Sequence, residues 1–372
     1  MFHLIITCDH ELPAGGRGDV RRHMIEPTTK LLRVCEQHAA KLTIMAEVGE
    51  LWAFEKTENA GFKKHIGYDP ALLIRDQLRE AVQRGHDVQL HLHPQWINAR
   101  WHGTCWVLDY KHYNLTDFED DQMLALLRRG KDNLETMLRP YCADYKCIGF
   151  RAGQWNTQPS PRYLTALRDA GLRSDTSVFK WGYRSNGAAD FDYRNAFSNV
   201  LAWYARMDDI NRPAPQPTVL EVPIATESVR YLRMLTPRRL WLGVSFLRED
   251  CETRTAINNA KRVQARPKRL ALRLGQLLQR YPRKLDFCKL TAREICSCIE
   301  ALINQCRDYQ DCLPIPLVMI GHSKETRNPE ELGVALGRAA KRRGGDLLFS
   351  TYRDFVADYI AAVARETGPN DQ

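Results

Sequence analysis

The 372-residue sequence lacks any apolar run approaching the roughly 18 residues that a membrane-spanning helix needs. The segment Met1 to Asp9 has no charged leader and no small-residue cleavage site, so we expect no signal peptide. There is no repeat of fixed period and no low-complexity segment, and 44% of the residues are apolar, which excludes disordered and fibrous chains. These absences predict a globular protein of the cytoplasm.

The 11 cysteines include no Cys-x-x-Cys pair, and the closest two are Cys296 and Cys298. An odd number of scattered cysteines without a signal peptide argues against a disulfide framework. We therefore expect reduced thiols, buried as small apolar side chains.

Positive charge is concentrated in one part of the chain. The formal net charge is +9, and residues 254–289 alone hold 11 basic side chains and a single acid, Asp286. Within that segment apolar residues recur at helical spacing between Arg269 and Tyr281, with basic residues beside them. Two interpretations of this predicted helix stay open. It lies on an anionic membrane surface, at the inner face of the membrane, or it packs on the fold with a solvated basic face. No recognition motif for nucleic acid accompanies the charges.

Short apolar runs alternate with helical patterns along most of the chain, which predicts an α/β fold with a parallel sheet. The predicted strands are Leu4–Thr7, Leu42–Ala46, Val88–His91, Cys147–Arg151, Arg173–Ser177, Leu317–Ile320 and Leu347–Ser350. The predicted helices are Thr28–Ala40, Pro70–Arg84, Asp117–Leu138, Pro161–Ala170, Glu330–Arg343 and Asp354–Glu366. Seven or eight such units favour a deformed (β/α) barrel of seven or eight parallel strands.

The alternation breaks between about 182 and 290, where Asn186-Gly187 and several prolines mark loops around one predicted strand, Val219–Pro223. The pattern resumes afterwards, so we interpret this region as a basic, partly helical elaboration inserted in the barrel. Residues 1–372 are accordingly predicted to form a single domain.

Acids, imidazoles and an arginine follow the predicted strands. They are Asp9 and Glu11 after the first, His91 and His93 after the third, Arg151 after the fourth, Asp175 after the fifth, and His322 late in the chain. The carboxyl ends of parallel strands meet at one face of a barrel, where catalytic residues collect. We therefore expect these side chains to form one site.

The His91-x-His93 spacing places two imidazoles on the same face of a strand, and Asp9 and Glu11 share a face in the same way. Imidazole and carboxylate are ordinary ligands of zinc, and three protein ligands leave a position for water. The pattern predicts a metal site with Glu11, His91 and His93 as ligands. A structural alternative also stands, in which one histidine caps a strand or packs against Trp96.

The motifs Thr7-x-Asp9, His91-x-His93, Phe150-Arg151-Ala152-Gly153 and Gly321-His322 together resemble those of the polysaccharide deacetylases. This group is also called the NodB-homology group, or carbohydrate esterase family 4. The resemblance spans residues 4 to 322 and implies a deformed barrel that uses a divalent metal, usually zinc, to remove acetyl groups from sugars. The chain resembles a variant, because the family's two histidines usually lie four residues apart.

The resemblance also implies residue roles. Asp9 matches the catalytic base that activates the attacking water, Arg151 the residue that orients this base, and Asp175 the acid that pairs with the arginine. His322 matches the general acid, and His91 the first histidine ligand. The position of the family's carboxylate metal ligand matches either Glu11 or His10 in this sequence. Strand alternation favours Glu11, on the same face as Asp9.

Three further residues lie beside the predicted site: Gln95, Trp96 and Trp155. Aromatic faces there suit stacking on a sugar ring, although packing in the core is an equal alternative. We group the three as candidate substrate-binding residues.

The function predicted from these motifs is metal-dependent removal of an acetyl group from an amino sugar of a glycan precursor, with a lipid-linked or nucleotide-linked carbohydrate as substrate. Two alternatives stay open. One is another metal-dependent C–N hydrolase of the deaminase or amidohydrolase type. The other is a catalytically silent barrel that binds glycans or membranes.

Overall fold

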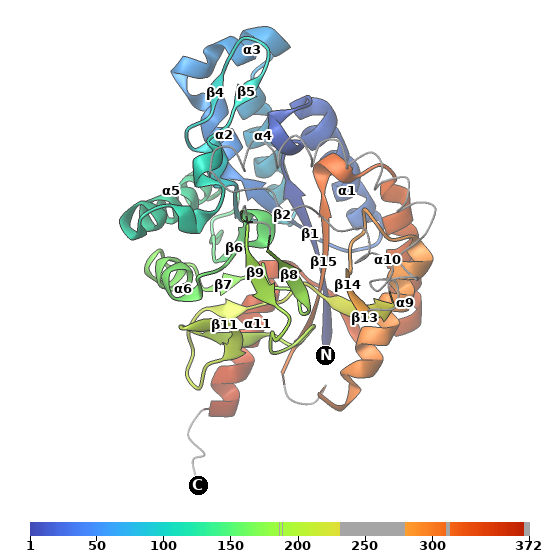
Figure 1. Cartoon of the computed structure of the whole chain (residues 1–372). Coiled ribbons are helices and arrows are strands. Elements are labelled where there is room, and N and C mark those ends of the chain that lie inside the picture. Colours follow the sequence, from blue (N-terminus) through green and yellow to red (C-terminus); the bar gives the residue numbers. More distant parts are fainter. Residues whose placement is uncertain (186, 188, 231–279, 310–312, 368–372) are drawn as a thin grey trace, which may run out of the picture.

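A curled sheet lies inside a layer of helices in the computed structural model (Figure 1). The model describes residues 1–367 apart from 186, 188, 231–279 and 310–312. Most of the apolar side chains between Phe2 and Tyr359 that are buried belong to a single cluster, which packs between the sheet and the helices.

The main sheet has ten strands, and its central part is parallel. In spatial order the parallel strands are β12 (Leu220–Glu221), β7 (Ser174–Asp175), β6 (Gly149–Ala152), β3 (Asp87–Leu92), β2 (Leu42–Glu47), β1 (Phe2–His10) and β15 (Ile315–His322). β16 (Leu347–Phe349) also pairs with β1 in parallel. These strands correspond to the predicted apolar runs, which confirms the α/β class with a largely parallel sheet.

β1 lies between β2 and β15 in this sheet, and all nine of its residues are buried. A parallel strand that is covered on both faces is apolar along most of its length, which explains why its sequence shows a run instead of an alternation. Its register with β15 places Asp9 directly beside His322. Two residues that are 313 positions apart in the chain are therefore neighbours at the same end of the sheet.

Helices that follow the strands in the sequence cover the sheet. They are α1 (Glu26–Gln37), α2 (Val48–Glu55), α3 (Ala60–Ile66), α4 (Pro70–Gln83), α5 (Asp120–Leu138), α6 (Ser160–Asp169), α9 (Ala292–Gln305), α10 (Pro329–Arg343) and α11 (Tyr352–Thr367). The start of α4 shows the local cause: the Asp69 carboxylate accepts hydrogen bonds from the backbone N–H groups of Ala71 and Leu72, and Pro70 occupies the first turn.

The predicted count of seven or eight parallel strands is not confirmed. β10 (Trp203–Arg206) and β11 (Asp209–Pro213) extend the sheet as an antiparallel pair. The region between 182 and 290 therefore contributes strands to the sheet as well as loops. Parallel bridges join Ile224 to Val318 and Asp286 to Ile320, so the sheet curls back from β12 toward β15.

The rest of the described elaboration contains short antiparallel strand pairs. β8 (Gly182–Arg184) pairs with β9 (Phe191–Tyr193), β13 (Thr226–Arg230) pairs with β14 (Arg280–Lys284), and β4 (Arg100–Trp101) pairs with β5 (Trp106–Val107) nearer the N-terminus. The predicted helix runs between Arg269 and Tyr281, and its residues up to 279 lie outside the described part of the chain. At Arg280 and Tyr281 that prediction is wrong, because both residues pair with β13.

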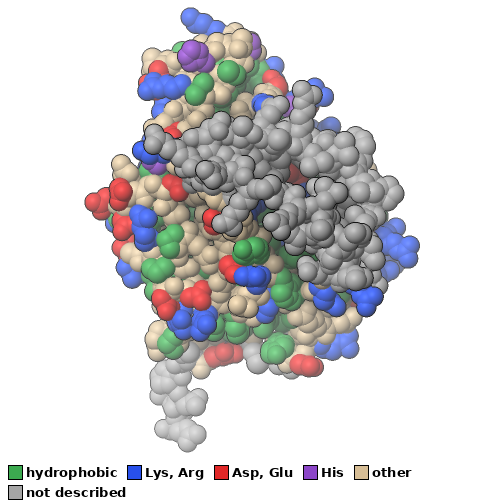
Figure 2. All heavy atoms as spheres, viewed as in Figure 1, with side chains coloured by type: hydrophobic (Ala, Val, Ile, Leu, Met, Phe, Trp, Pro, Cys, Tyr) green, Lys and Arg blue, Asp and Glu red, His purple; other side chains and the backbone are tan. Residues whose placement is uncertain are grey.

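Nine described cysteines are free and seven of them are buried, as expected for reduced thiols. Within the described residues no helix has the length and apolar character needed to cross a bilayer. Figure 2 shows basic and acidic side chains interspersed over the described part of one face. The assignment of the whole chain to one domain stays a prediction.

Candidate active site

The strand ends bring the predicted site residues together. Asp9 and Glu11 come from the end of β1, His91 and His93 from the end of β3, Arg151 from β6 and His322 from β15. All six side chains are buried. β3 and β6 pair so that His91 lies beside Arg151, just as Asp9 lies beside His322. The sequence argument from strand ends therefore predicted the correct cluster of neighbours.

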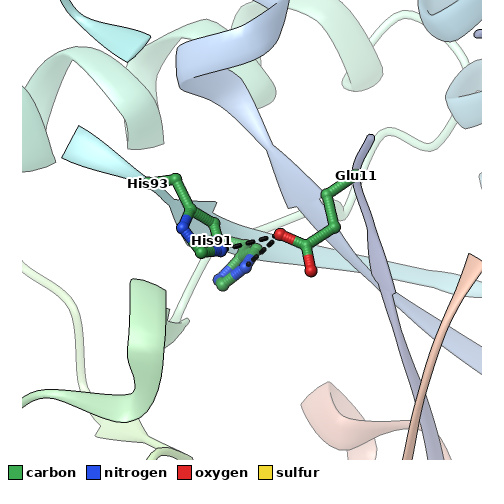
Figure 3. A group of neighbouring side chains, drawn as sticks. All are labelled: Glu11, His91 and His93. Atoms are coloured by element: carbon green, nitrogen blue, oxygen red, sulfur yellow. Dashed lines mark ion pairs between the residues drawn. The ribbon is translucent and has the colours of Figure 1, made fainter. Parts of the chain in front are cut away.

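Glu11, His91 and His93 form a group that could hold a metal ion (Figure 3). Glu11 Oε2 lies 2.7 Å from His93 Nε2 and 3.5 Å from His91 Nε2. Candidate ligand atoms of the three residues lie within 4.8 Å of one another, as do those of a second group, Asp9, Glu11 and His322. Glu11 belongs to both groups.

The geometry distinguishes His10 from Glu11 as the candidate third metal ligand. His10 points away from the site, and its Nε2 lies 2.9 Å from the side-chain oxygen of Gln77 on α4. Glu11 faces the histidines because side chains alternate along a strand. Of the two, only Glu11 is placed to bind a metal with His91 and His93.

His91 carries an unused ring nitrogen. Its Nδ1 lies 2.8 Å from the backbone carbonyl of Arg151, to which the Nδ1–H donates. This hydrogen bond leaves the lone pair on Nε2, which is buried and has no hydrogen-bond partner among the described residues. A metal-binding histidine needs this arrangement, with one nitrogen donating to an acceptor and the other facing the ion. The donor set therefore fits a divalent metal.

The surroundings of His91 favour positive charge. Burial lowers the pKa of His91, but the carboxylates of Asp9, Glu11 and Glu47 outweigh burial and raise the pKa to about 9. A site that holds a proton this strongly offers the same attraction to a divalent cation, which competes with the proton for Nε2.

The Nδ1 atom of His93 also lies near possible hydrogen-bond partners. This atom lies 3.3 Å from the amide nitrogen of Gln95 and 3.5 Å from that of Gln154. The Gln95 amide oxygen is buried and has no hydrogen-bond partner among the described residues. A half-turn of this amide would let the oxygen accept from Nδ1–H, as a histidine that uses Nε2 as a ligand requires.

Arg151 holds Asp9. The fully buried guanidinium donates from Nη1 to Asp9 Oδ1 at 2.6 Å, from Nη2 to Thr7 Oγ1 at 2.9 Å and from Nε to the carbonyl of Thr176 at 3.0 Å. Burial raises the pKa of Asp9, but Arg151 and the neighbouring imidazoles lower it below its ordinary value. Asp9 is therefore ionised despite its burial.

The predicted ion pair between Arg151 and Asp175 is absent from the described ion pairs, and this part of the prediction is wrong. The Asp175 carboxylate instead accepts hydrogen bonds from the Tyr163 hydroxyl and from the backbone N–H and hydroxyl of Ser177. Burial raises the pKa of Asp175, and burial together with the adjacent Asp175 raises the pKa of Glu221 well above its ordinary value. Asp175 hydrogen-bonds Tyr163 of α6, and the ion pair described for Arg151 is the one with Asp9.

His322 lies between the two acids of β1. Its Nε2 is 3.5 Å from Asp9 Oδ2 and 3.9 Å from Glu11 Oε1, and its Nδ1 is 3.6 Å from Glu325 Oε2. Burial lowers the pKa of His322. An imidazole at this position can exchange a proton with a group bound beside Asp9.

Two of the three candidate substrate-binding residues lie at the site. Gln95 contacts His93, as described above, and the Trp155 ring centroid lies 6.1 Å from that of His322. Trp96 is 3% exposed and packs against Phe54 and Trp106 in an aromatic cluster, which is the core-packing alternative.

Sequence reasoning missed two further charged neighbours. Lys324 Nζ lies 2.8 Å from Glu11 Oε1, so this ammonium is paired with the second oxygen of the same carboxylate. Glu47 accepts a hydrogen bond of 2.6 Å from the backbone N–H of His93 and fixes the end of β3. Glu47 is the last residue of β2, so the strand-end argument would have found it had it been applied to that strand.

Comparison with known proteins gives fold-level likeness at low identity. No model of a protein family matches the chain, and no curated protein sequence matches it. Among solved structures, a putative polysaccharide deacetylase from Mycobacterium smegmatis is 12% identical, with a TM-score of 0.48 over 100% of this chain and 93% of that one.

Two other solved structures resemble the chain to a similar degree. PuuE allantoinase is 12% identical, with a TM-score of 0.45 over 97% of this chain and 90% of that one. A GH57 branching enzyme from Thermococcus kodakaraensis is 12% identical, with a TM-score of 0.48 over 96% and 71%.

Proposed function

We propose that this protein is a metal-dependent hydrolase that removes an acetyl group from an amino sugar of a glycan precursor. The observation that carries the proposal is the buried Nε2 of His91, which makes no hydrogen bond with the described residues and faces Glu11 beside His93. Two imidazoles and one carboxylate with space for water are typical of a catalytic zinc site. When bound there, the metal would polarise the acetyl carbonyl and acidify water.

The other residues would divide the proton transfers. Asp9, kept ionised by Arg151, accepts the proton of the water whose oxygen attacks the acetyl carbon. The C–N bond then breaks, and His322 donates a proton to the departing amine, so that acetate and a free amino sugar leave. Asp9 and His322 lie 3.5 Å apart, close enough to act on the same bound group.

The same arrangement argues against a silent binding barrel. Asp9, Glu11, Arg151 and His322 are all charged or titratable and all buried, and a fold alone gains little from such a cluster. The amide substrate, the carbohydrate and its carrier belong to the proposal through the resemblance of the sequence motifs. Membrane contact through residues 269–281 stays a prediction, since most of that segment lies outside the described residues.

The proposal is tested first by metal analysis of protein purified without chelator. We expect about one equivalent of zinc or another divalent metal per chain, lost in His91→Ala and Glu11→Gln. Asp9→Asn should keep the metal, because Asp9 is not in the group formed by Glu11 and the two histidines. His102→Ala, at an exposed position, is the matched control and should keep both metal and activity.

The second measurement is acetate release from acetylated amino-sugar oligosaccharides. Asp9→Asn should lower the rate by about 100-fold or more, which is the usual loss when a general base is removed. A metal content below about half an equivalent, or undiminished acetate release by Asp9→Asn, would contradict the proposal.

A further inference from the structure

Lys284, the last residue of β14, lies on the aromatic side of the candidate site. Its Nζ is 3.1 Å from the ring centroid of Trp155 and 4.5 Å from that of Phe179. The side chain is half-buried. An ammonium on an aromatic face is stabilised by the ring quadrupole, most strongly where water is largely removed.

The charge of Lys284 differs from that of the other cations around the site. Arg151 is paired with Asp9, Lys324 with Glu11, and Lys289 with both Asp286 and Glu325. None of the ion pairs formed by the described residues includes Lys284. Burial, together with the neighbouring positive charge of Lys289, lowers its pKa well below the ordinary value. Asp286 and Glu325 raise this pKa, and a bound anion would in the same way favour the charged ammonium form.

Trp155 connects Lys284 to the reacting groups. The indole ring centroid lies 6.1 Å from that of His322, and the preceding residue, Gln154, reaches His93 Nδ1 at 3.5 Å. One face of Trp155 is already covered by the ammonium, so this face is not open for a sugar ring. The position next to His322 is instead lined by a cation held on an indole.

The loop that carries Trp155 is held in an unusual backbone conformation. Gln154 and Trp155 have φ angles of 62° and 56°, in the left-handed region that residues with a side chain adopt only at a cost in free energy. The Tyr193 hydroxyl donates to the Trp155 carbonyl at 2.6 Å. Gly153 allows the close approach, because a Cβ there would lie 2.6 Å from the carbonyl oxygen of Leu92. Such strain persists where the surroundings define one position, which is what a binding subsite requires.

We infer that Lys284 and Trp155 form an anion-binding subsite beside the candidate metal centre, and that the substrate therefore carries a carboxylate or phosphate group near its acetylated amine. The substrate class rests on the proposed function, whereas the subsite itself rests on the contacts of Lys284. A carboxylate or phosphate oxygen would give the ammonium the partner that it lacks among the described residues. Arg184, which donates to the side-chain oxygen of Gln154 at 3.3 Å, adds a second positive charge to the same wall.

The test is calorimetric titration of sodium phosphate and of sodium acetate into the full-length, zinc-loaded protein at constant ionic strength. We expect saturable binding of at least one of these anions in the millimolar range. Phosphate binding points to a phosphorylated substrate and acetate binding to a carboxylate. Lys284→Met should weaken the binding at least tenfold, while Lys284→Arg should retain most of it.

Two further variants complete the design. Lys180→Met is the matched control: Lys180 Nζ lies 5.9 Å from the ring centroid of Trp181, a lysine and tryptophan pair outside the site, and binding should be unchanged. Trp155→Phe keeps the charge but shortens the aromatic support, so binding should weaken a few-fold. This second variant gives the answer if Lys284→Met does not fold.

Absence of saturable binding in the unaltered protein would overturn the inference. Equal binding by the unaltered protein and the Lys284→Met and Trp155→Phe variants would also overturn it, because the anion would then lie elsewhere, for example on the metal. A protein that binds anions through Lys284 but releases no acetate from any amino sugar would contradict the proposed function and leave the subsite standing.

Discussion

Two pairs of buried carboxyl groups at the same end of the sheet behave in opposite ways. Asp9 and Glu11 are 2% and 4% exposed, while Asp175 and Glu221 are fully buried. The first pair meets Arg151, Lys324 and three imidazoles, and the pKa values of both acids are lowered. The second pair meets hydroxyl groups and its own partner acid, and both pKa values are raised.

The difference shows that burial does not decide the charge of an acid at a strand end. Burial raises the pKa in all four cases, and only neighbouring cations reverse its effect. A carboxyl group without a neighbouring cation has a raised pKa, and Asp175 serves as a hydrogen-bonding structural group. Asp9 is available as a base because Arg151 contacts it, and Asp175 is not.

The largest effect is expected from Arg151→Met, which removes the cation beside Asp9 and so the difference between the two acid pairs. An unpaired charge would remain in the core, so we expect the free energy of unfolding to fall by about 3–5 kcal/mol, measured by urea denaturation. Catalytic activity should be lost in the same variant, because the pKa of Asp9 would rise.

Arg206→Met provides the matched control, since Arg206 forms an exposed ion pair with Asp208. This variant should unfold at nearly the same urea concentration as the unaltered protein. If both arginine variants lose the same small amount of stability, Arg151 does not compensate a buried charge on Asp9. The proposed difference between the two acid pairs would then be wrong.

The second pair is tested by the pH dependence of stability in Glu221→Gln. The folded-state pKa of Glu221 lies above its unfolded value of about 4.3, so its proton stabilises the fold fully below that pH. The stabilisation is lost as the pH rises through the folded-state pKa. Glutamine cannot ionise, so the free energy of unfolding of the variant should decline less with pH, by up to about 1.4 kcal/mol per pH unit.

Urea denaturation at several pH values between about 4 and 8 measures this slope. Parallel profiles for the variant and the unaltered protein would mean that Glu221 is ionised in the folded state. The two acid pairs would then have the same charge, contrary to the comparison.

The smallest expected effect comes from Tyr163→Phe, which removes the hydroxyl that donates to Asp175. Loss of one buried hydrogen bond should lower the free energy of unfolding by about 1 kcal/mol. Metal content and activity should be unchanged, because Asp175 makes no ion pair with Arg151 in the described structure. A loss of bound metal in this variant would instead show that the Asp175–Glu221 pair and the Asp9–Glu11 pair belong to one interaction network.

Much of the site followed from one rule, that parallel strands end together. Apolar runs located β1, β3, β6 and β15, and the residues after them, including Glu11, His91 and His322, do lie together. Strand alternation also separated Glu11 from His10. These features depend on the backbone, whose periodicity is visible in a sequence.

The features that sequence reasoning missed depend on side-chain direction and on short strands. Asp175 ends the two-residue strand β7, and nothing in its spacing says whether it faces Arg151 or Tyr163. β10 and β11 have four and five residues, too few for a pattern that distinguishes an antiparallel edge from a loop. Lys324 reaches Glu11 from a short helical turn after β15, where no period applies.

The register of β1 with β15 has a consequence for the order in which the protein is made. A ribosome that has reached about residue 100 has already synthesised Glu11, His91 and His93, the three candidate metal ligands. His322 and Lys324 follow only after more than 200 further residues. Closing so long a loop is slow, and domains of this topology form such contacts late. Under the proposed function, a growing chain would hold its three candidate metal ligands well before β15 pairs with β1 and brings His322 to the site.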